Sequence, residues 1–196
     1  MKIGAVVLAA GSSSRLGESK QLLQHEGRPL VRRIAETAIA AGCDPVAVVV
    51  GAGREKVAAT LHDLAVTIVP NDAWERGLGT SLRAGVAQLR DSDALLLLVC
   101  DQPFVSVDLL RQLIAAQQKT QKPMAASAYG GTIGVPALFT RACFAQLLSL
   151  GEEEGAKTLL TSRPDEVAPV DFPSGAIDID TPADFEALQR EHGASA

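Results

Sequence analysis

Short apolar runs alternate with helix-like segments along most of the chain, and this alternation constrains the fold more than any other feature. The first run, IGAVVLAA at residues 3–10, lacks the polar alternation of a half-exposed strand, so we expect it to be covered on both faces. The further strand-like runs are VAVVV at 46–50, VTIV at 66–69 and ALLLLV at 94–99. Helical patterns lie at 30–41, 54–61, 80–89 and 106–118, the last with Ser106 as its N-cap. The succession predicts a three-layer, doubly wound (Rossmann-like) α/β fold with a mainly parallel sheet.

The second half of the chain carries weaker signals. They are strands at 124–129 and 132–135, helices near Cys143 and Leu159, and finally a strand at 176–180 followed by a helix capped by Thr181. No linker, repeat or low-complexity tract interrupts the 196 residues. We therefore expect one domain spanning residues 1–196.

Composition and charge narrow the classes of function. The net charge is −5 without a basic stripe, which argues against a nucleic-acid partner. No apolar run reaches about 18 residues, so no membrane span is expected. The three cysteines form no CxxC pair and the three histidines are scattered, so we expect no zinc site, histidines at the surface and a reducing cytoplasm as the location.

The first strand runs into a loop of glycine and serine, AAGSSSRLGESK. Gly11 and Gly17 make its backbone permissive, and Arg15 and Lys20 are its cations. Such a loop offers backbone N–H groups and positive charge to a phosphate. One alternative is a secretory signal, but its cleavage would remove the strand at 3–10 from the fold. The other is a strand-to-helix connection that binds nothing.

The familiar nucleotide fingerprints do not fit this loop. Between Gly11 and Gly17 there are five residues where the P-loop needs four, and Glu18 stands where its lysine belongs. GAG at 51–53 resembles a dinucleotide turn, but Lys56 occupies the third glycine position, which favours an ordinary strand-to-helix turn.

Asp101 comes just after the strand at 94–99, with Cys100 between them, and ligands of open α/β sheets bind beyond the carboxyl ends of strands. Its alternative role is a turn or helix-cap acid. Beside bound phosphates a bare carboxylate is unfavourable, because two unit charges about 4 Å apart repel by roughly 4 kcal/mol at a protein surface. A divalent cation reverses that sign, so Asp101 next to a phosphate loop implies Mg²⁺. Asp178 and Asp180 are candidates for the second ligand, or else cap the final helix.

Several motifs together resemble the MobA-like nucleotidyltransferases. LAAGSSSRLGESKQLL is similar to the opening signature of that family, roughly LAAG-x-S-x-R-x-G-x-x-K-x-L. The resemblance continues through NDAWERGLGTSL at 71–82, CDQP at 100–103, GTIGVPALF at 131–139, GAKTLL at 155–160 and DIDTP at 178–182. LAAG with GLGTSL looks most like the molybdenum cofactor cytidylyltransferases. Cys100, Val135 and Lys157 depart from the family pattern.

The resemblance implies the fold of the nucleotide-diphospho-sugar transferases and a Mg²⁺-dependent transfer of CMP from CTP to the terminal phosphate of molybdopterin, with release of pyrophosphate. It also implies a nucleotide-binding N-terminal half, an acceptor-binding C-terminal half and a molybdoenzyme that receives the product. The implied catalytic residues are Arg15, Lys20 and Asp101, and the metal ligands Asp101, Asp178 and Asp180. The implied nucleotide-binding residues are Leu8, Ala9, Ala10, Gly11, Arg15, Lys20, Asn71, Gly79, Thr80 and Ser81, and the acceptor-binding residues Gly134, Pro136 and Lys157.

Other functions are compatible with the same residues. Guanylyl transfer to the same acceptor would use a similar nucleotide loop, and so would nucleotidyl transfer to a sugar 1-phosphate or another small phosphate. A nucleotide-binding chaperone for a molybdoenzyme would bind CTP without releasing pyrophosphate, and a structural domain would leave the loop empty.

Overall fold

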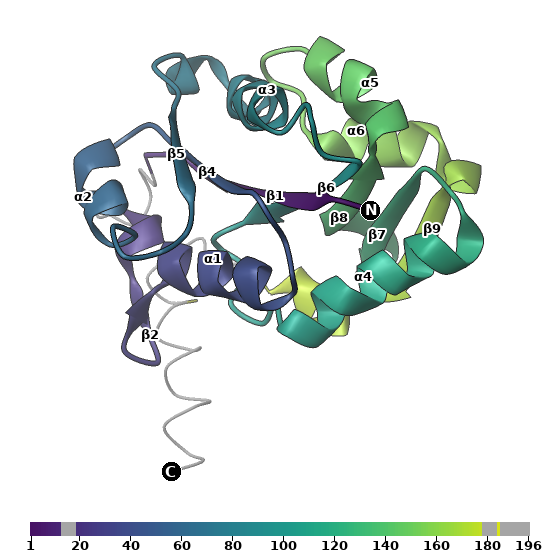
Figure 1. The fold of residues 1–196 in the computed structure, drawn as a ribbon, viewed down its shortest axis with the longest axis horizontal. Helices are drawn as coiled ribbons and strands as arrows, with labels where there is room; N and C mark the ends of the chain where they lie inside the picture. Colours follow the sequence, from purple (N-terminus) through teal and green to yellow (C-terminus); the bar gives the residue numbers. More distant parts are fainter. Residues whose placement is uncertain (13–18, 178–183, 185–196) are drawn as a thin grey trace.

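A seven-stranded sheet forms the centre of the molecule, with helices on both faces (Figure 1). The computed structural model describes residues 1–12, 19–177 and 184. The strand order is β5-β4-β1-β6-β8-β7-β9. Its strands are β1 (Ile3–Ala9), β4 (Val46–Val50), β5 (Thr67–Pro70), β6 (Ala94–Val99), β7 (Met124–Tyr129), β8 (Thr132–Thr140) and β9 (Val167–Asp171). Strands β5, β4, β1 and β6 run parallel, and only β8 is antiparallel to its neighbours in this sheet. The predicted doubly wound, mainly parallel α/β fold is confirmed.

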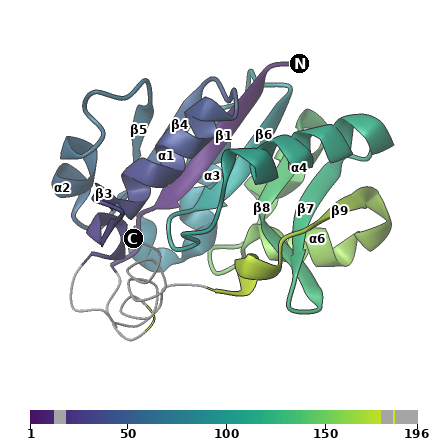
Figure 2. The ribbon, with the colours of Figure 1, turned by 90° about the horizontal axis from the view of Figure 1, so that it is seen from below.

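The helices cover the sheet in two layers. Helices α1 (Leu30–Ala40), α2 (Arg54–Ala59) and α4 (Val107–Thr120) lie on one face, and α3 (Leu78–Gln88), α5 (Phe144–Ser149) and α6 (Ala156–Ser162) on the other (Figures 1 and 2). The shorter elements are the hairpin β2 (Gln24–His25) with β3 (Arg28–Pro29) and the 3₁₀ turns η1 (Lys20–Leu22), η2 (Trp74–Arg76), η3 (Arg141–Cys143), η4 (Pro164–Glu166) and η5 (Pro173–Ala176).

Both faces of strand β1 are buried, which explains why its sequence is apolar throughout. Ala5, Val7 and Ala9 face the core under α1 and α4, whereas Val6 and Leu8 face the core under α3. Each of these side chains is at most 7% exposed. A strand buried on both faces needs no polar alternation, as expected for this run.

The second half departs from the predicted boundaries. The predicted strand ends before Pro136, whereas strand β8 continues to Thr140. Its pairing with β7 shifts from Ala126↔Ala137 to Ser127↔Gly134, which leaves Val135 and Pro136 in a bulge. The bulge lets the strand continue past the proline. Proline lacks an N–H to donate, and a bulge tolerates that loss. Residue 176, predicted as a strand start, belongs to η5, and the remainder of that strand and the Thr181 cap lie outside the described residues.

Two local predictions have different outcomes. Ser106 caps α4 as expected, because its Oγ accepts a hydrogen bond of 3.2 Å from the Leu109 N–H. The prediction that all three histidines lie at the surface is wrong for His25, which is 3% exposed. Alternation along β2 points Gln24 outward and His25 inward. Within the described part of the chain, every helix is too short or too polar to cross a membrane.

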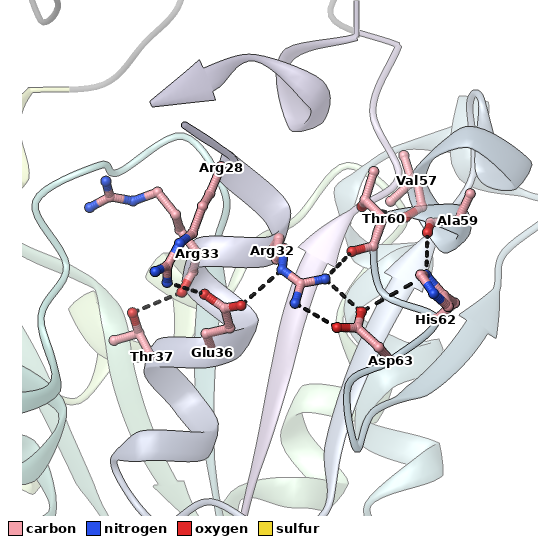
Figure 3. Close-up of polar contacts among 10 residues, drawn as sticks. All are labelled: Arg28, Arg32, Arg33, Glu36, Thr37, Val57, Ala59, Thr60, His62 and Asp63. Atoms are coloured by element: carbon pink, nitrogen blue, oxygen red, sulfur yellow. Dashed lines mark hydrogen bonds and ion pairs between the residues drawn. The ribbon is translucent and has the colours of Figure 1, made fainter. Parts of the chain in front are cut away.

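Arg32 joins α1 to the segment after α2 (Figure 3). Its Nη1 and Nη2 donate to the two carboxylate oxygens of Asp63 at 2.6 and 2.8 Å, and its Nε donates to Glu36 at 2.8 Å. Nη1 also donates to the Thr60 carbonyl oxygen at 2.9 Å. Hydrogen bonding from Arg32, together with a backbone hydrogen bond, lowers the pKa of Asp63 below its ordinary value.

We expect this contact to make stability depend on pH. A carboxyl group whose pKa is lower in the folded state stabilises the protein above its unfolded pKa, near pH 4, and loses that contribution as the pH falls through the folded pKa. Urea unfolding should show wild type more stable than Asp63→Asn at pH 7, with the difference shrinking toward pH 3. Asp72→Asn is the matched control, because Asp72 is 90% exposed and its side chain pairs with the exposed Arg54 at 2.9 Å. A difference for Asp63→Asn that is constant with pH would contradict the assignment.

Candidate active site

A pocket of about 320 Å³ opens where β1 and β6 end. It lies at the carboxyl edge of the parallel strands, as predicted from the fold class. The residues that line it are Leu8, Ala9, Ala10, Gly11, Lys20, Gln21, Trp74, Leu78, Ser81, Val99, Cys100 and Asp101. Many of the residues predicted to bind nucleotide are therefore brought together in one place.

Lys20 and Asp101 form an ion pair in this pocket. Lys20 Nζ lies 3.0 Å from Asp101 Oδ2, although the two residues are 81 positions apart in the sequence. Their side chains are 13% and 28% exposed, so the pair is partly shielded from water yet open to a ligand. A polyanion entering the pocket would compete for the ammonium group and leave the carboxylate available to a cation.

Gln21 fixes the loop that starts at the end of β1. Its side chain is 2% exposed, and its Nε2 donates to the carbonyl oxygens of Ala9 at 3.0 Å and Gly11 at 2.6 Å. Gln21 is not among the predicted site residues, because glutamine is mostly exposed in proteins and its place in the sequence gives no signal of burial. The amide holds two residues of the predicted nucleotide loop in place.

Substitution of Gln21→Leu should therefore destabilise the fold by about 1–3 kcal/mol, since the buried carbonyl group of Ala9 and the partly buried one of Gly11 both lose a donor. Chemical denaturation measures the loss. Gln24→Leu is the control, because Gln24 is exposed and three residues away. Equal effects of the two substitutions would rule out a role for the Gln21 amide in the loop.

Asn71 and Thr80 hold one side of the site together from outside the pocket. Asn71 Nδ2 donates to the hydroxyl oxygens of Thr80 and Ser81 at 2.9 Å each, and Asn71 Oδ1 accepts from the Ala73 N–H at 3.0 Å. Of the three residues Asn71, Thr80 and Ser81, only Ser81 lines the pocket. The polar groups of Asn71 thus fasten the chain after β5 to the start of α3.

Gly79 is in contact with another loop. Its N–H donates to the Glu152 carbonyl oxygen at 2.7 Å, and a Cβ on Gly79 would lie 2.0 Å from the Gly151 carbonyl oxygen. Gly77 likewise has no room for a Cβ, which would lie 2.3 Å from the Glu152 carbonyl oxygen. These glycines let the first turn of α3 pack directly on residues 151–154.

The residues predicted to bind the acceptor lie on other elements. Gly134 and Pro136 belong to β8, where the Pro136 carbonyl oxygen accepts a hydrogen bond of 2.8 Å from Ser127. Lys157 is exposed on α6. These three residues are separate from the pocket lining described above. Arg15, Asp178 and Asp180 lie outside the described residues.

Asp101 is chemically suited to a hard divalent cation, because its carboxylate oxygens are the ligands that Mg²⁺ and Mn²⁺ prefer. Burial, helped by the adjacent carboxylate of Asp101, raises the pKa of the Cys100 thiol to about 12, so the thiol is protonated at neutral pH and is a poor nucleophile. Among the residues that the structure describes, no three His, Cys, Asp or Glu side chains gather into a metal site. Asp101 fits as one ligand, and the other predicted ligands are among the residues not described.

Curated proteins of related sequence include the purine catabolism protein PucB of Bacillus subtilis, 33% identical over 198 residues that cover 94% of this chain and 95% of PucB. Nicotine blue oxidoreductase of Paenarthrobacter nicotinovorans is 37% identical over 117 residues, 59% of this chain. That match spans 57% of the length of the oxidoreductase.

Solved structures resemble the chain over nearly its whole length. The crystal structure of Rv0371c from Mycobacterium tuberculosis superposes with a TM-score of 0.84 at 29% identity, covering 97% of this chain and 98% of that one. A complex of Rv0371c with manganese gives a TM-score of 0.78 at 26% identity, covering 97% and 99%. The model of the MobA-like NTP transferase domain matches residues 5–167. With this match over most of its length, the chain belongs to the MobA-like NTP transferase family.

Proposed function

We propose that this nucleotidyltransferase moves CMP from CTP to the terminal phosphate of a molybdopterin-type cofactor and releases pyrophosphate. The observation that carries the proposal is the Lys20–Asp101 pair, 3.0 Å apart in a pocket at the carboxyl ends of β1 and β6. The choice of CTP and of a molybdopterin acceptor rests on the motifs LAAG and GLGTSL. In this proposal the N-terminal half binds the nucleotide and the C-terminal half, with Gly134, Pro136 and Lys157, binds the acceptor.

The reaction needs charge neutralisation and alignment more than it needs a base. An oxygen of the acceptor phosphate attacks the α-phosphorus of CTP, a new P–O bond forms, and the bond to the β-phosphate oxygen breaks as pyrophosphate leaves. A phosphate monoester has a second pKa of about 6, so the nucleophile is already mostly dianionic at neutral pH. The lack of a histidine among the described lining residues is therefore no obstacle.

Lys20 has two roles in this scheme. In the ligand-free arrangement its ammonium group neutralises Asp101. When the triphosphate binds, Lys20 turns to the phosphate oxygens and stabilises the charge that develops on the leaving pyrophosphate, with Arg15 and the backbone around Gly11. The same movement exposes the carboxylate of Asp101.

Asp101, with Asp178 or Asp180, would then hold Mg²⁺ or a related divalent ion. An ion held there would supply positive charge to offset the negative charge of the triphosphate. The Rv0371c complex with manganese supports a divalent-metal requirement in this family. Cys43, Cys100 and Cys143 are all free and buried, which agrees with a reducing compartment, and we place the activity in the cytoplasm.

The test is pyrophosphate release from CTP, GTP and ATP in turn, with Mg²⁺ and molybdopterin-type cofactor as acceptor. Release with CTP alone is the expected result. Release with GTP alone would assign guanylyl transfer, and release only with a sugar 1-phosphate would assign a different acceptor. CTP binding without pyrophosphate release under any of these conditions would indicate a cofactor chaperone and overturn the enzymatic assignment.

A further inference from the structure

The candidate pocket has chemically different ends. Strand β1 lies between β4 and β6, with Ala9 beside Val50 on one side and Leu8 beside Val99 on the other. The chain beyond β6 carries Asp101, which pairs with Lys20. The chain beyond β4 begins with Gly51, against which the only tryptophan of the sequence packs. The charged end and the aromatic end are therefore separated by the end of β1.

Gly51 determines where Trp74 lies. A Cβ on Gly51 would lie 2.6 Å from Trp74 Cγ and 2.7 Å from the Ala10 carbonyl oxygen. The tryptophan side chain thus rests directly on the backbone of Gly51, beside the end of β1. Trp74 is half-buried and lines the pocket, as does Leu78, whose side chain is largely exposed at the start of α3.

The spacing of the two ends suits a nucleotide. Neighbouring strands lie about 4.8 Å apart, so the ends of β4 and β6 are separated by roughly 10 Å. A nucleoside triphosphate whose phosphates contact Lys20 places its sugar and heterocycle across a comparable distance. The heterocycle then reaches the side of the pocket that Trp74 lines.

The polar groups of Asn71 are already used next to Trp74. Its amide nitrogen donates to Thr80 and Ser81, and its amide oxygen accepts from the N–H of Ala73, the residue before Trp74. Asn71 therefore holds the turn that presents Trp74, which makes it a positioning residue instead of a contact to the base.

We propose that Trp74 is the residue on which the heterocycle of the nucleotide stacks, and that Gly51 and Asn71 hold it in place. This inference rests on the proposed function, since it assumes that the pocket accepts a nucleoside triphosphate. Every base has an aromatic face, so stacking raises affinity with little regard to which base is bound. The choice between CTP and GTP then falls to the backbone groups of Ala9 and Ala10.

The tryptophan itself reports on binding. CTP should change the fluorescence of Trp74 saturably. Inorganic tripolyphosphate needs only the charged end of the pocket, so calorimetry should detect its binding while the fluorescence of Trp74 changes much less. A tripolyphosphate response equal to that of CTP, or a CTP-bound protein with unchanged fluorescence, would overturn the inference.

Two substitutions separate stacking from packing. Trp74→Leu keeps an apolar side chain and should weaken CTP, GTP and ATP in parallel by about tenfold to a hundredfold, with tripolyphosphate affinity unchanged. Trp74→Phe restores an aromatic face and should recover most of the affinity. Phe172→Leu is the matched control, because Phe172 packs against Tyr129 away from the pocket and should leave nucleotide affinity unchanged.

The outcomes distinguish this inference from the proposed function. Three results would each overturn the stacking role even if pyrophosphate release proceeds. They are wild-type affinity for CTP in Trp74→Leu, an equal loss of affinity for CTP and for tripolyphosphate in that variant, and failure of Trp74→Phe to recover the affinity. Fluorescence and affinity changes as expected, together with no pyrophosphate release from the wild type, would support Trp74 and overturn the transferase assignment alone.

Discussion

The Asp101→Asn variant should lose nucleotidyl transfer by about a thousandfold while its melting temperature stays within a few degrees of wild type. The substitution keeps the shape of the side chain but removes the charge that faces Lys20 and that would hold the metal ion. The side chain is 28% exposed and lies at the end of β6, so it contributes little to the core. Pyrophosphate release under saturating CTP and Mg²⁺ measures the loss, and thermal unfolding checks the fold.

Asp171→Asn is the matched control for this substitution. Asp171 is the last residue of β9 and is exposed, so it is also an acid at a strand end but lies away from the pocket. Its variant should keep the wild-type rate. Lys20→Ala should weaken nucleotide binding and slow the reaction together, because Lys20 is proposed to contact the phosphates in both states. A wild-type rate in Asp101→Asn would remove Asp101 from the mechanism.

The position of Asp101 beside the loop that carries Lys20 could be predicted from the sequence because it depends on sheet topology. The apolar runs at 3–10 and 94–99 have no polar alternation, so they indicate buried parallel strands. The carboxyl ends of neighbouring parallel strands share one edge, and β1 does pair with β6. Asp101, just beyond β6, must therefore lie close to the chain that leaves β1. The exact position of Lys20, eleven residues beyond Ala9, depends in addition on the loop between them.

Features that depend on distant partners could not be predicted in the same way. Strand β9, VAPVD, has a proline in its centre and two exposed positions, so it gives a weak strand signal and forms because β7 supplies a partner. The burial of Gln21 depends on two carbonyl groups of the preceding loop. The hydrogen bonds of Asn71 depend on how the turn after β5 meets α3.

Gly79 is the position where sequence and structure suggest different effects of a single substitution. Because Gly79 lies in the first turn of α3, helix propensity alone favours Gly79→Ala, by up to about 1 kcal/mol. The structure predicts the opposite sign. The new Cβ would lie 2.0 Å from the Gly151 carbonyl oxygen, 2.9 Å from that of Glu154 and 3.0 Å from that of Glu152. Backbone atoms cannot rotate away as a side chain can, so the loop 151–154 must move.

We expect Gly79→Ala to destabilise the protein by about 3 kcal/mol, the upper range of the overpacking cost, as measured by chemical denaturation. Gly11→Ala is the matched control, because Gly11 lines the pocket and a Cβ there would meet no atom of the described residues within 4 Å. If Gly79 were needed only to let a nucleotide approach, Gly79→Ala would fold with wild-type stability and lose affinity for CTP. If Gly79 is needed for the contact with residues 151–154, Gly79→Ala lowers the free energy of unfolding whether or not CTP is present. Added CTP then raises the free energy of unfolding of the variant and of the wild type by similar amounts.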